Sequence, residues 1–260
     1  GCRSSSSATR PVWCVRLTTW TAHALASNAR SYRRELWRVV EAQHTASTMR
    51  LVDSLDEQSL LESVLEESKP KLPAGTEKLH YLLATPFRYR PRSGSRFRAS
   101  FDAGVWYGAE VLRTALAEKS YWRLRFLLDS PGTPDLRPVP HTAFTAIAAG
   151  TALDLMASPL NRDRAKWTHR TSYEATQALA ATAREAQIQI IRYKSVRDPE
   201  HAACAALLTP AVFQRSRPKR LETWFIAASR THVRCARDAR DGATWQFTAE
   251  QLLGEPLTKG

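Results

Sequence analysis

The sequence predicts an α+β fold in which helices and mostly antiparallel strands occupy different stretches of the chain. The last third holds short apolar runs separated by polar turns, which is typical of antiparallel strands. Helical periodicity is clearest earlier, and no internal repeat is present. We expect residues 1–11 to be disordered or to derive from processing or cloning. Residues 12–78 should form a mainly helical N-terminal extension, and residues 79–260 the main domain.

Two helices are expected in the extension. Residues 31–50 place apolar side chains on one helical face. Residues 54–68 follow a helical pattern more clearly, with Ser54 as the N-cap and Glu57 three residues later. Prolines and a glycine after residue 69 end this second helix.

Shorter elements follow. Strands are expected at Leu79–Ala84, Gly104–Gly108, Trp122–Leu128 and Ile188–Tyr193, and helices at Ala109–Ser120 and Thr171–Ala186. Residues 129–140 hold four prolines and are expected to be a loop, whereas residues 142–155 fit either a strand or a helix. The final strands are expected at Ala205–Leu208, Thr223–Ala227, His232–Ala236 and Thr244–Phe247.

Composition favours a cytoplasmic protein with an anionic ligand or partner. The net charge is +13, but acids and bases alternate in blocks along the chain, which favours local sites over one continuous nucleic-acid groove. The four cysteines are scattered, so neither a structural zinc nor a disulfide scaffold is expected. No run of 18 apolar residues exists, so we expect no membrane span. A Gly-x-Gly-x-x-Gly signature and a phosphate loop are both absent, which argues against a dehydrogenase or a kinase.

The segment Phe87–Arg98 is the first candidate for an anion site. It reads FRYRPRSGSRFR, with five arginines in eleven residues and no acid among them. The guanidinium fork makes paired bonds to phosphate or carboxylate oxygens. By itself this segment could serve nucleic acid, a nucleotide or an acidic protein.

Several short motifs follow one another in a characteristic order. They are Arg88-Tyr89, the Gly94–Phe97 turn (GSRF), Tyr107 at the end of a short strand, Glu118 eleven residues later, and Ser195 within YKSVR. In this order and spacing they resemble the RES domain family over roughly residues 79–247.

The resemblance implies a fold similar to that of ADP-ribosyltransferases, with a split, mostly antiparallel sheet around a cleft for NAD. It also implies a bacterial toxin held by a cognate antitoxin. NAD would be a substrate, with no separate cofactor or metal. The reaction would be phosphorolysis or hydrolysis of the nicotinamide glycosidic bond, or transfer of ADP-ribose to a target protein.

The resemblance also implies roles for individual residues. Glu118 would stabilise the oxocarbenium-like ribose. Arg88 and Arg96 would bind the pyrophosphate, with Arg88 favoured as the arginine of the family name. Tyr107, or else Tyr89, would stack on the nicotinamide. Ser195 would hydrogen-bond the glutamate or the ribose. The remaining cations of the run, Arg90, Arg92 and Arg98, are expected to form a solvated rim.

Other interpretations stay open at this stage. By residue type alone, Tyr107 fits a half-buried aromatic, Glu118 a solvated helix residue and Ser195 a turn residue. The main alternative is a nucleic-acid-binding module that uses residues 87–98 for phosphate contact and base stacking. A third is a catalytically inactive protein that binds an acidic partner. A homodimer is compatible with the sequence.

Overall fold

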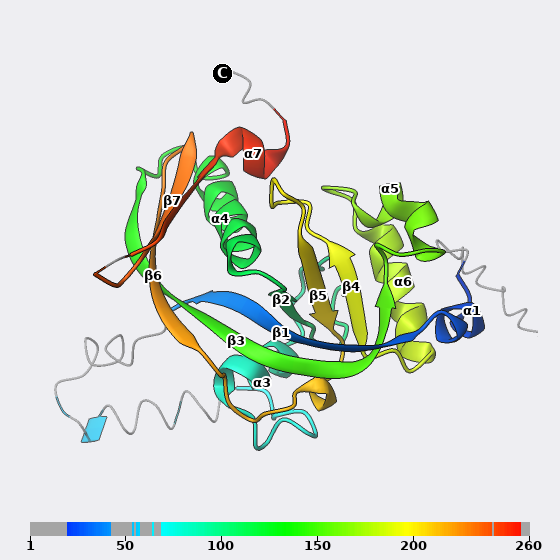
Figure 1. Ribbon diagram of the computed structural model, residues 1–260. Helices are drawn as coiled ribbons and strands as arrows, with labels where there is room; N and C mark the ends of the chain where they lie inside the picture. The colour runs from blue at the N-terminus through cyan, green and yellow to red at the C-terminus, as the bar shows by residue number, and fades with distance from the viewer. Residues whose placement is uncertain are drawn as a thin grey trace, which may run out of the picture.

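The computed structural model describes residues 20–42, 69–240 and 242–255, together with Ser54, Asp56, Glu57 and Val64. The helices are α1 (Ala22–Ser27), α3 (Tyr81–Arg88), α4 (Leu112–Leu128), α5 (Arg164–Trp167), α6 (Glu174–Glu185) and α7 (Ala249–Leu253). The strands are β1 (Arg30–Glu41), β2 (Trp106–Ala109), β3 (Leu136–Asp154), β4 (Ile190–Lys194), β5 (Ala203–Leu207), β6 (Leu221–Ala228), β7 (His232–Arg237) and β8 (Thr244–Thr248) (Figure 1).

The strands of the described chain form one sheet in the order β1-β2-β5-β4-β3-β6-β7-β8, and β1 also pairs with β3. The first part of β3 pairs antiparallel with β6, and its end pairs parallel with β4. β1 follows β3 along its whole length but meets β2 only at Trp37 and Ala109. The sheet is therefore split into a β2-β5-β4 half and a β6-β7-β8 half, joined by β1 and β3. The expected α+β fold with a mostly antiparallel sheet is confirmed.

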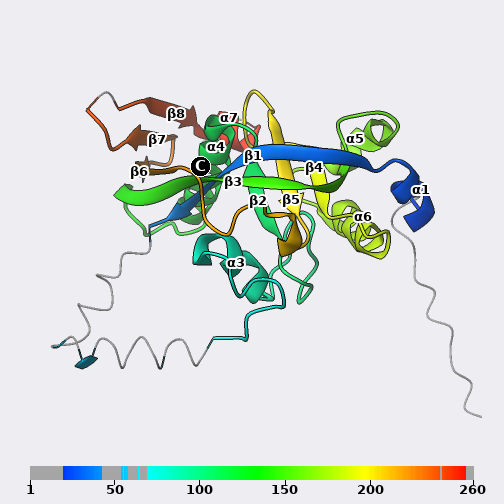
Figure 2. The same cartoon turned by 60° about the horizontal axis from the view of Figure 1, so that its bottom comes forward.

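Helices cover both halves of the sheet (Figures 1 and 2). One apolar cluster joins α1, α5 and α6 to β4 and β5, and a second joins α3 to β1 and β3. A third joins α4 and α7 to β6, β7 and β8. Because α4 also contacts β1 and β2, it lies where the two halves of the sheet meet. No helix in the described part of the chain is long and apolar enough to cross a membrane.

The prediction of a helix over residues 31–50 is wrong for residues 31–42, the part of this segment that the structure describes. Residues 30–41 form β1, paired with β3 from Arg30–Ala152 to Glu41–His141. The buried side chains of Tyr32 and Leu36 are four residues apart, which matches a helical face. The same spacing fits one face of a strand, whose side chains alternate, so pairing with β3 decides the extended form. This segment is thus an integral strand of the main sheet rather than part of a separate helical extension.

Two expected strands are helices. Residues 79–84 were predicted to be extended, yet α3 begins at Tyr81, and the His80 side chain accepts a hydrogen bond from the Leu82 amide at 3.3 Å. Residues 122–128 form the last turns of α4. Short apolar runs do not distinguish a strand from a buried helix by pattern alone.

The proline-rich loop is shorter than expected, because β3 begins at Leu136. Pro138 and Pro140 precede His141, where the pairing of β3 with β1 ends, so they lie where β3 pairs with β6 alone. Strand ends with one partner tolerate proline, which lacks an N–H group. Residues 142–155, which fitted either strand or helix, continue β3.

The other elements predicted from residue 104 onward are confirmed. They are the strands β2, β4, β5, β6, β7 and β8 and the helices α4 and α6. The predicted helix 54–68 lies mostly outside the described residues, as do residues 1–11. In its described part, the Glu57 amide donates to Ser54 Oγ at 3.1 Å, which is the bond expected of an N-cap.

Candidate active site

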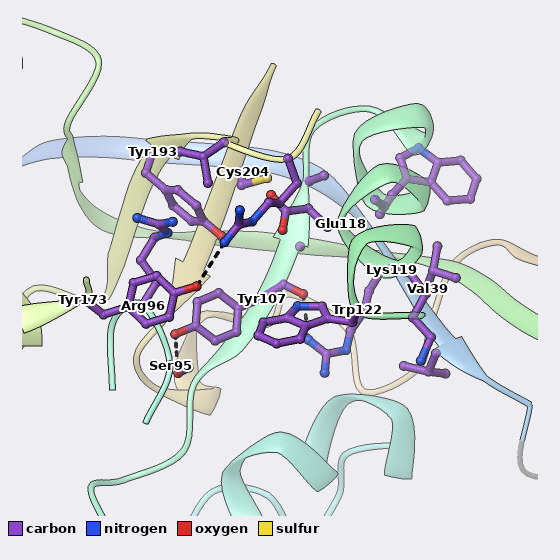
Figure 3. Close-up of a pocket in the computed structure, with 18 of the residues that line it drawn as sticks. Val39, Ser95, Arg96, Tyr107, Glu118, Lys119, Trp122, Tyr173, Tyr193 and Cys204 are labelled. Atoms are coloured by element: carbon purple, nitrogen blue, oxygen red, sulfur yellow. Dashed lines mark hydrogen bonds between the residues drawn. The ribbon is translucent and has the colours of Figure 1, made fainter. Parts of the chain in front are cut away.

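A cavity of about 450 Å³ opens between α4, β1, β2 and the segment after β4 (Figure 3). This volume lies in the range typical of small-molecule sites. Its polar and aromatic lining includes Trp37, Arg38, Ser95, Arg96, Tyr107, Glu118, Lys119, Trp122, Tyr173, Tyr193 and Arg197. Figure 3 shows Glu118 between Arg96 and Tyr173 on one side and Lys119 on the other.

The side chains of Glu118 and Ser195 are joined by a hydrogen bond. Ser195 follows β4 and is fully buried, and its Oγ donates to Glu118 Oε1 at 2.6 Å. The same Oγ accepts the backbone amides of Arg197 at 3.2 Å and Asp198 at 3.0 Å. A hydroxyl has one proton and two lone pairs, so the serine proton has only the glutamate left as its partner. The expected bond from Ser195 to the glutamate is present.

The environment of Glu118 disfavours its ionised form. Burial raises the pKa of its carboxyl group, against the opposing hydrogen bond from Ser195 and the positive charges of Arg197 and Arg96. Asp198 adds a smaller increase. A carboxyl group with a raised pKa that faces a cavity is typical of a functional site.

The turn that carries Arg96 is tied down by two side chains. Tyr107, on β2, accepts the Phe97 amide at its hydroxyl at 3.0 Å and shares a 2.8 Å hydrogen bond with Ser95 Oγ. Gln177, on α6, donates to the carbonyl groups of Ser95 and Arg98. The Tyr107 hydroxyl is thus used within the protein, which leaves its ring as the part that faces the cavity.

Two buried arginines lie beside the Glu118–Ser195 pair. Arg96 Nη1 donates to the carbonyls of Trp167 and His169, each at 3.0 Å, and its guanidinium lies 4.8 Å from the Tyr173 ring centre. Arg197 stacks on Tyr121, at 3.6 Å from the ring centre. Its Nη2 donates to the Arg170 carbonyl at 2.6 Å. These contacts hold both guanidinium groups at the cavity wall.

Arg38 and Lys119 are two further cations that line the cavity beyond Glu118. Arg38 Nη1 donates to the Tyr107 carbonyl at 2.7 Å, while Arg38 Nε is buried and has no hydrogen-bond partner among the described residues. Burial lowers the pKa of Arg38 to about 10 and also lowers the pKa of Lys119. An anionic ligand would offset the cost of burying these charges.

The structure does not bring Arg88 or Tyr89 to Glu118. Arg88 Nε donates to the Pro70 carbonyl at 2.6 Å, and the side chain lines a separate cavity with Lys71 and Arg90. Tyr89 is exposed and does not line the Glu118 cavity. Arg88, which the sequence favoured as the arginine of the family name, therefore lines a different cavity, whereas Arg96, kept as a second ligand, lines the cavity of Glu118.

Arg98 was expected to belong to a solvated rim, but its side chain is buried. It is 7% exposed and donates to the carbonyl groups of Pro91, Ser93 and Ala99. Arg90 and Arg92 are exposed, in agreement with the expectation.

Several cavity residues were missed by the sequence analysis. Arg197 lay in the quoted YKSVR segment, two residues after Ser195, and this proximity was an available signal. Arg38 is on the segment that was mistaken for a helix. Tyr173 and Lys119 carry no sequence signal, because their place in the cavity depends on tertiary packing. Within the described residues, no three His, Cys, Asp or Glu side chains gather as a metal site would require.

Fold and cavity together define an α+β protein in which three arginines, and a carboxylate hydrogen-bonded to a serine, face one ligand-sized space. The family model of the RES domain matches residues 73–238, so the chain belongs to the RES domain family. The match contains Arg96, Tyr107, Glu118 and Ser195, whereas β1 lies before it.

No curated protein sequence matches the chain. Among solved structures, a chain of the crystal structure of the M. tuberculosis MbcT–MbcA toxin–antitoxin complex is similar, with a TM-score of 0.48 and 10% sequence identity. The similarity covers 79% of this chain and 92% of that chain.

Proposed function

We propose that this protein cleaves the nicotinamide glycosidic bond of NAD and acts as the toxin of a bacterial toxin–antitoxin pair. The observation that carries the proposal is the 2.6 Å bond from Ser195 to Glu118 in a cavity that Arg96 and Arg197 also line. Membership of the RES domain family supports it.

The reaction requires little proton transfer at the leaving group, because nicotinamide departs as a neutral molecule. What needs stabilisation is the positive charge that develops on the ribose. The Glu118 carboxylate is suited to this role, and Ser195 orients it. Since burial raises the pKa of Glu118, the cavity holds a carboxylate that a nearby positive charge would strongly stabilise.

The arginines are suited to the pyrophosphate. Arg96 and Arg197 are held by carbonyl bonds and aromatic stacking, so little of their conformational entropy would be lost on binding. The Tyr107 ring would stack on the nicotinamide. Of the two arginines first considered for the pyrophosphate, Arg88 and Arg96, this assignment keeps Arg96 and adds Arg197.

The proposal includes an antitoxin that covers the cavity mouth. Trp122 and Phe126, one helical turn apart on α4, are 57% and 58% exposed, and Trp122 also lines the cavity. Exposed aromatics next to cations such as Lys119 suit a partner that offers apolar and acidic side chains. Replacing both aromatics with serine should weaken binding of the antitoxin about 100-fold or more. Phe126→Ser alone, at a position outside the cavity lining, should also weaken binding and leave turnover of NAD by the free enzyme within threefold.

The alternative of a nucleic-acid-binding module is not favoured. It needs residues 87–98 to present their arginines to solvent. Arg96 and Arg98 are 9% and 7% exposed, and both bond backbone carbonyls. Only part of the run is therefore available for phosphate contact.

Nicotinamide release from NAD tests the proposal. The wild-type protein should release nicotinamide in at least one of three incubations: with water as the only acceptor, with added phosphate, or with a candidate target protein. Mass spectrometry would then identify ADP-ribose 1″-phosphate, free ADP-ribose or an ADP-ribosylated protein as the second product. Equal release by wild type and Glu118→Gln would overturn the assignment.

A further inference from the structure

Asp198 is a buried carboxylate that the proposed reaction does not use directly. It is fully buried, three residues after Ser195. Thr114 Oγ1 donates to its Oδ2 at 2.7 Å, and Arg113 donates to its Oδ1. The backbone amides of Glu200 and Ala202 donate to it at 3.1 and 3.4 Å. Such a network fixes both the carboxylate and the loop that carries it.

The partners of Asp198 come from the helix that carries Glu118. Thr114 and Glu118 are four residues apart on α4 and so lie on the same face of the helix. The segment 195–202 is thereby attached to α4 at two points, through Ser195 to Glu118 and through Asp198 to Thr114. Two attachments one turn apart prevent the loop from sliding or tilting against the helix.

The same segment sets the direction of the serine proton. The Asp198 amide donates to Ser195 Oγ at 3.0 Å, beside the Arg197 amide. Both lone pairs of the hydroxyl are occupied only while the backbone at 197–198 keeps its place. The Asp198 carboxylate holds that backbone in place.

We propose that Asp198 is a positioning residue of the active site, which clamps segment 195–202 to α4 and so directs the Ser195 hydroxyl to Glu118. The proposal rests on the proposed function for its kinetic consequence, but its structural consequence does not depend on activity. Asp198 acts through Ser195 and does not contact the substrate.

Amide hydrogen exchange tests the structural part. Asp198→Asn and Thr114→Val should each speed exchange of the Arg197 and Asp198 amides by about tenfold or more. Thr114→Ser keeps the hydroxyl and should restore protection. Glu200→Gln is the matched control, because Glu200 pairs with the same Arg113 from an exposed position and should change nothing. Unchanged exchange in both Asp198→Asn and Thr114→Val would overturn the proposal even for a protein that does not turn over NAD.

A double-mutant cycle tests the kinetic part. Asp198→Asn should lower kcat for nicotinamide release by about tenfold at most, with KM within threefold. In a Ser195→Ala background the same substitution should have no further effect, because the residue acts through the serine. If Asp198→Asn does not fold, Thr114→Val takes its place in the cycle. Additive losses would overturn the positioning role, whereas a wild type without turnover would overturn the proposed function alone.

Discussion

Glu110 and Glu118 are eight residues apart, and their environments shift the pKa values of their carboxyl groups in opposite directions. Glu110, just after β2, receives two bonds from the Arg192 guanidinium, at 2.8 and 3.2 Å, and a third from the Tyr32 hydroxyl at 3.1 Å. Burial alone would raise the pKa of Glu110, but the bonds and charge of Arg192 outweigh it and lower the pKa. This carboxylate ties β1 and β4 to the end of β2.

Among the residues that the structure describes, Glu118 has no such ion pair. It accepts a hydrogen bond from a neutral serine, and its arginine neighbours donate to carbonyl groups instead. Burial therefore prevails and the pKa is raised. The difference teaches that a carboxylate paired within the protein stabilises the fold, whereas one left with a neutral donor at a cavity is available to a positive charge from outside.

The largest expected effect is on activity. Glu118→Gln should lower the rate of nicotinamide release by more than about 100-fold, because the amide cannot stabilise the charge on the ribose. Glu110→Gln is an isosteric control on the neighbouring carboxylate and should stay within about threefold of wild type. Initial rates at saturating NAD provide the measurement. Comparable losses of rate in the two variants would contradict the distinction between a catalytic Glu118 and a structural Glu110.

The second effect is on stability. Glu110→Gln leaves the Arg192 guanidinium with a weaker partner, so the free energy of unfolding should fall by about 2 kcal/mol. Glu118→Gln removes a buried charge that lacks an ion pair, so the free energy of unfolding should stay equal or rise. Urea unfolding followed by circular dichroism measures both. A larger loss in Glu118→Gln than in Glu110→Gln would contradict this interpretation.

The third effect concerns the hydroxyl donors of the two carboxylates. Ser195→Ala should lower kcat about tenfold, because Glu118 loses its bond and two backbone amides lose their acceptor. Tyr32→Phe should cost about 1 kcal/mol of stability and leave kcat unchanged. Paired kinetic and unfolding measurements separate the roles, and an unchanged kcat in Ser195→Ala would remove the serine from the site.

The sequence predicted the chemically distinctive part of this contrast. Glu118, Tyr107 and Ser195 were identified from their order and spacing. Tyr107 and Glu118 line one cavity, and the buried Ser195 donates a hydrogen bond to Glu118. Each lies in an element that its neighbours in the sequence predict: Tyr107 in a short strand, Glu118 in a helix and Ser195 in the turn after a strand. Arg96 was identified as well, from the Gly94–Phe97 motif, and in the structure Tyr107 holds this turn.

What the sequence could not predict depends on long-range pairing. Arg38 reaches the cavity because β1 pairs with β3, and the apolar spacing of β1 also fits a helix. Arg88 was favoured by its neighbour Tyr89, but it ends α3 and points to a different cavity. Glu110 drew no attention, because its partners Tyr32 and Arg192 are 78 and 82 residues away in the sequence.

The smallest expected effect is on the pH dependence of the free energy of unfolding, to which Glu110 and Glu118 should contribute with opposite signs. For Glu118, whose folded pKa is raised, the stabilising contribution of the protonated carboxyl is complete below the unfolded value of 4.5 and is lost as pH rises through the folded pKa. For Glu110, whose folded pKa is lowered, the contribution is present above 4.5 and is lost as pH falls through the folded pKa.

Unfolding free energies of wild type and the two glutamine variants between pH 3 and pH 8 should therefore diverge in different directions. The advantage of Glu118→Gln over wild type should grow as pH rises above 4.5, while the deficit of Glu110→Gln should shrink as pH falls below it. Burial also lowers the pKa of His141 to about 4, but this group is present in all three proteins and cancels in the differences. Parallel curves would show that the two carboxylates are held alike, and the distinction between a structural and a functional glutamate would then fail.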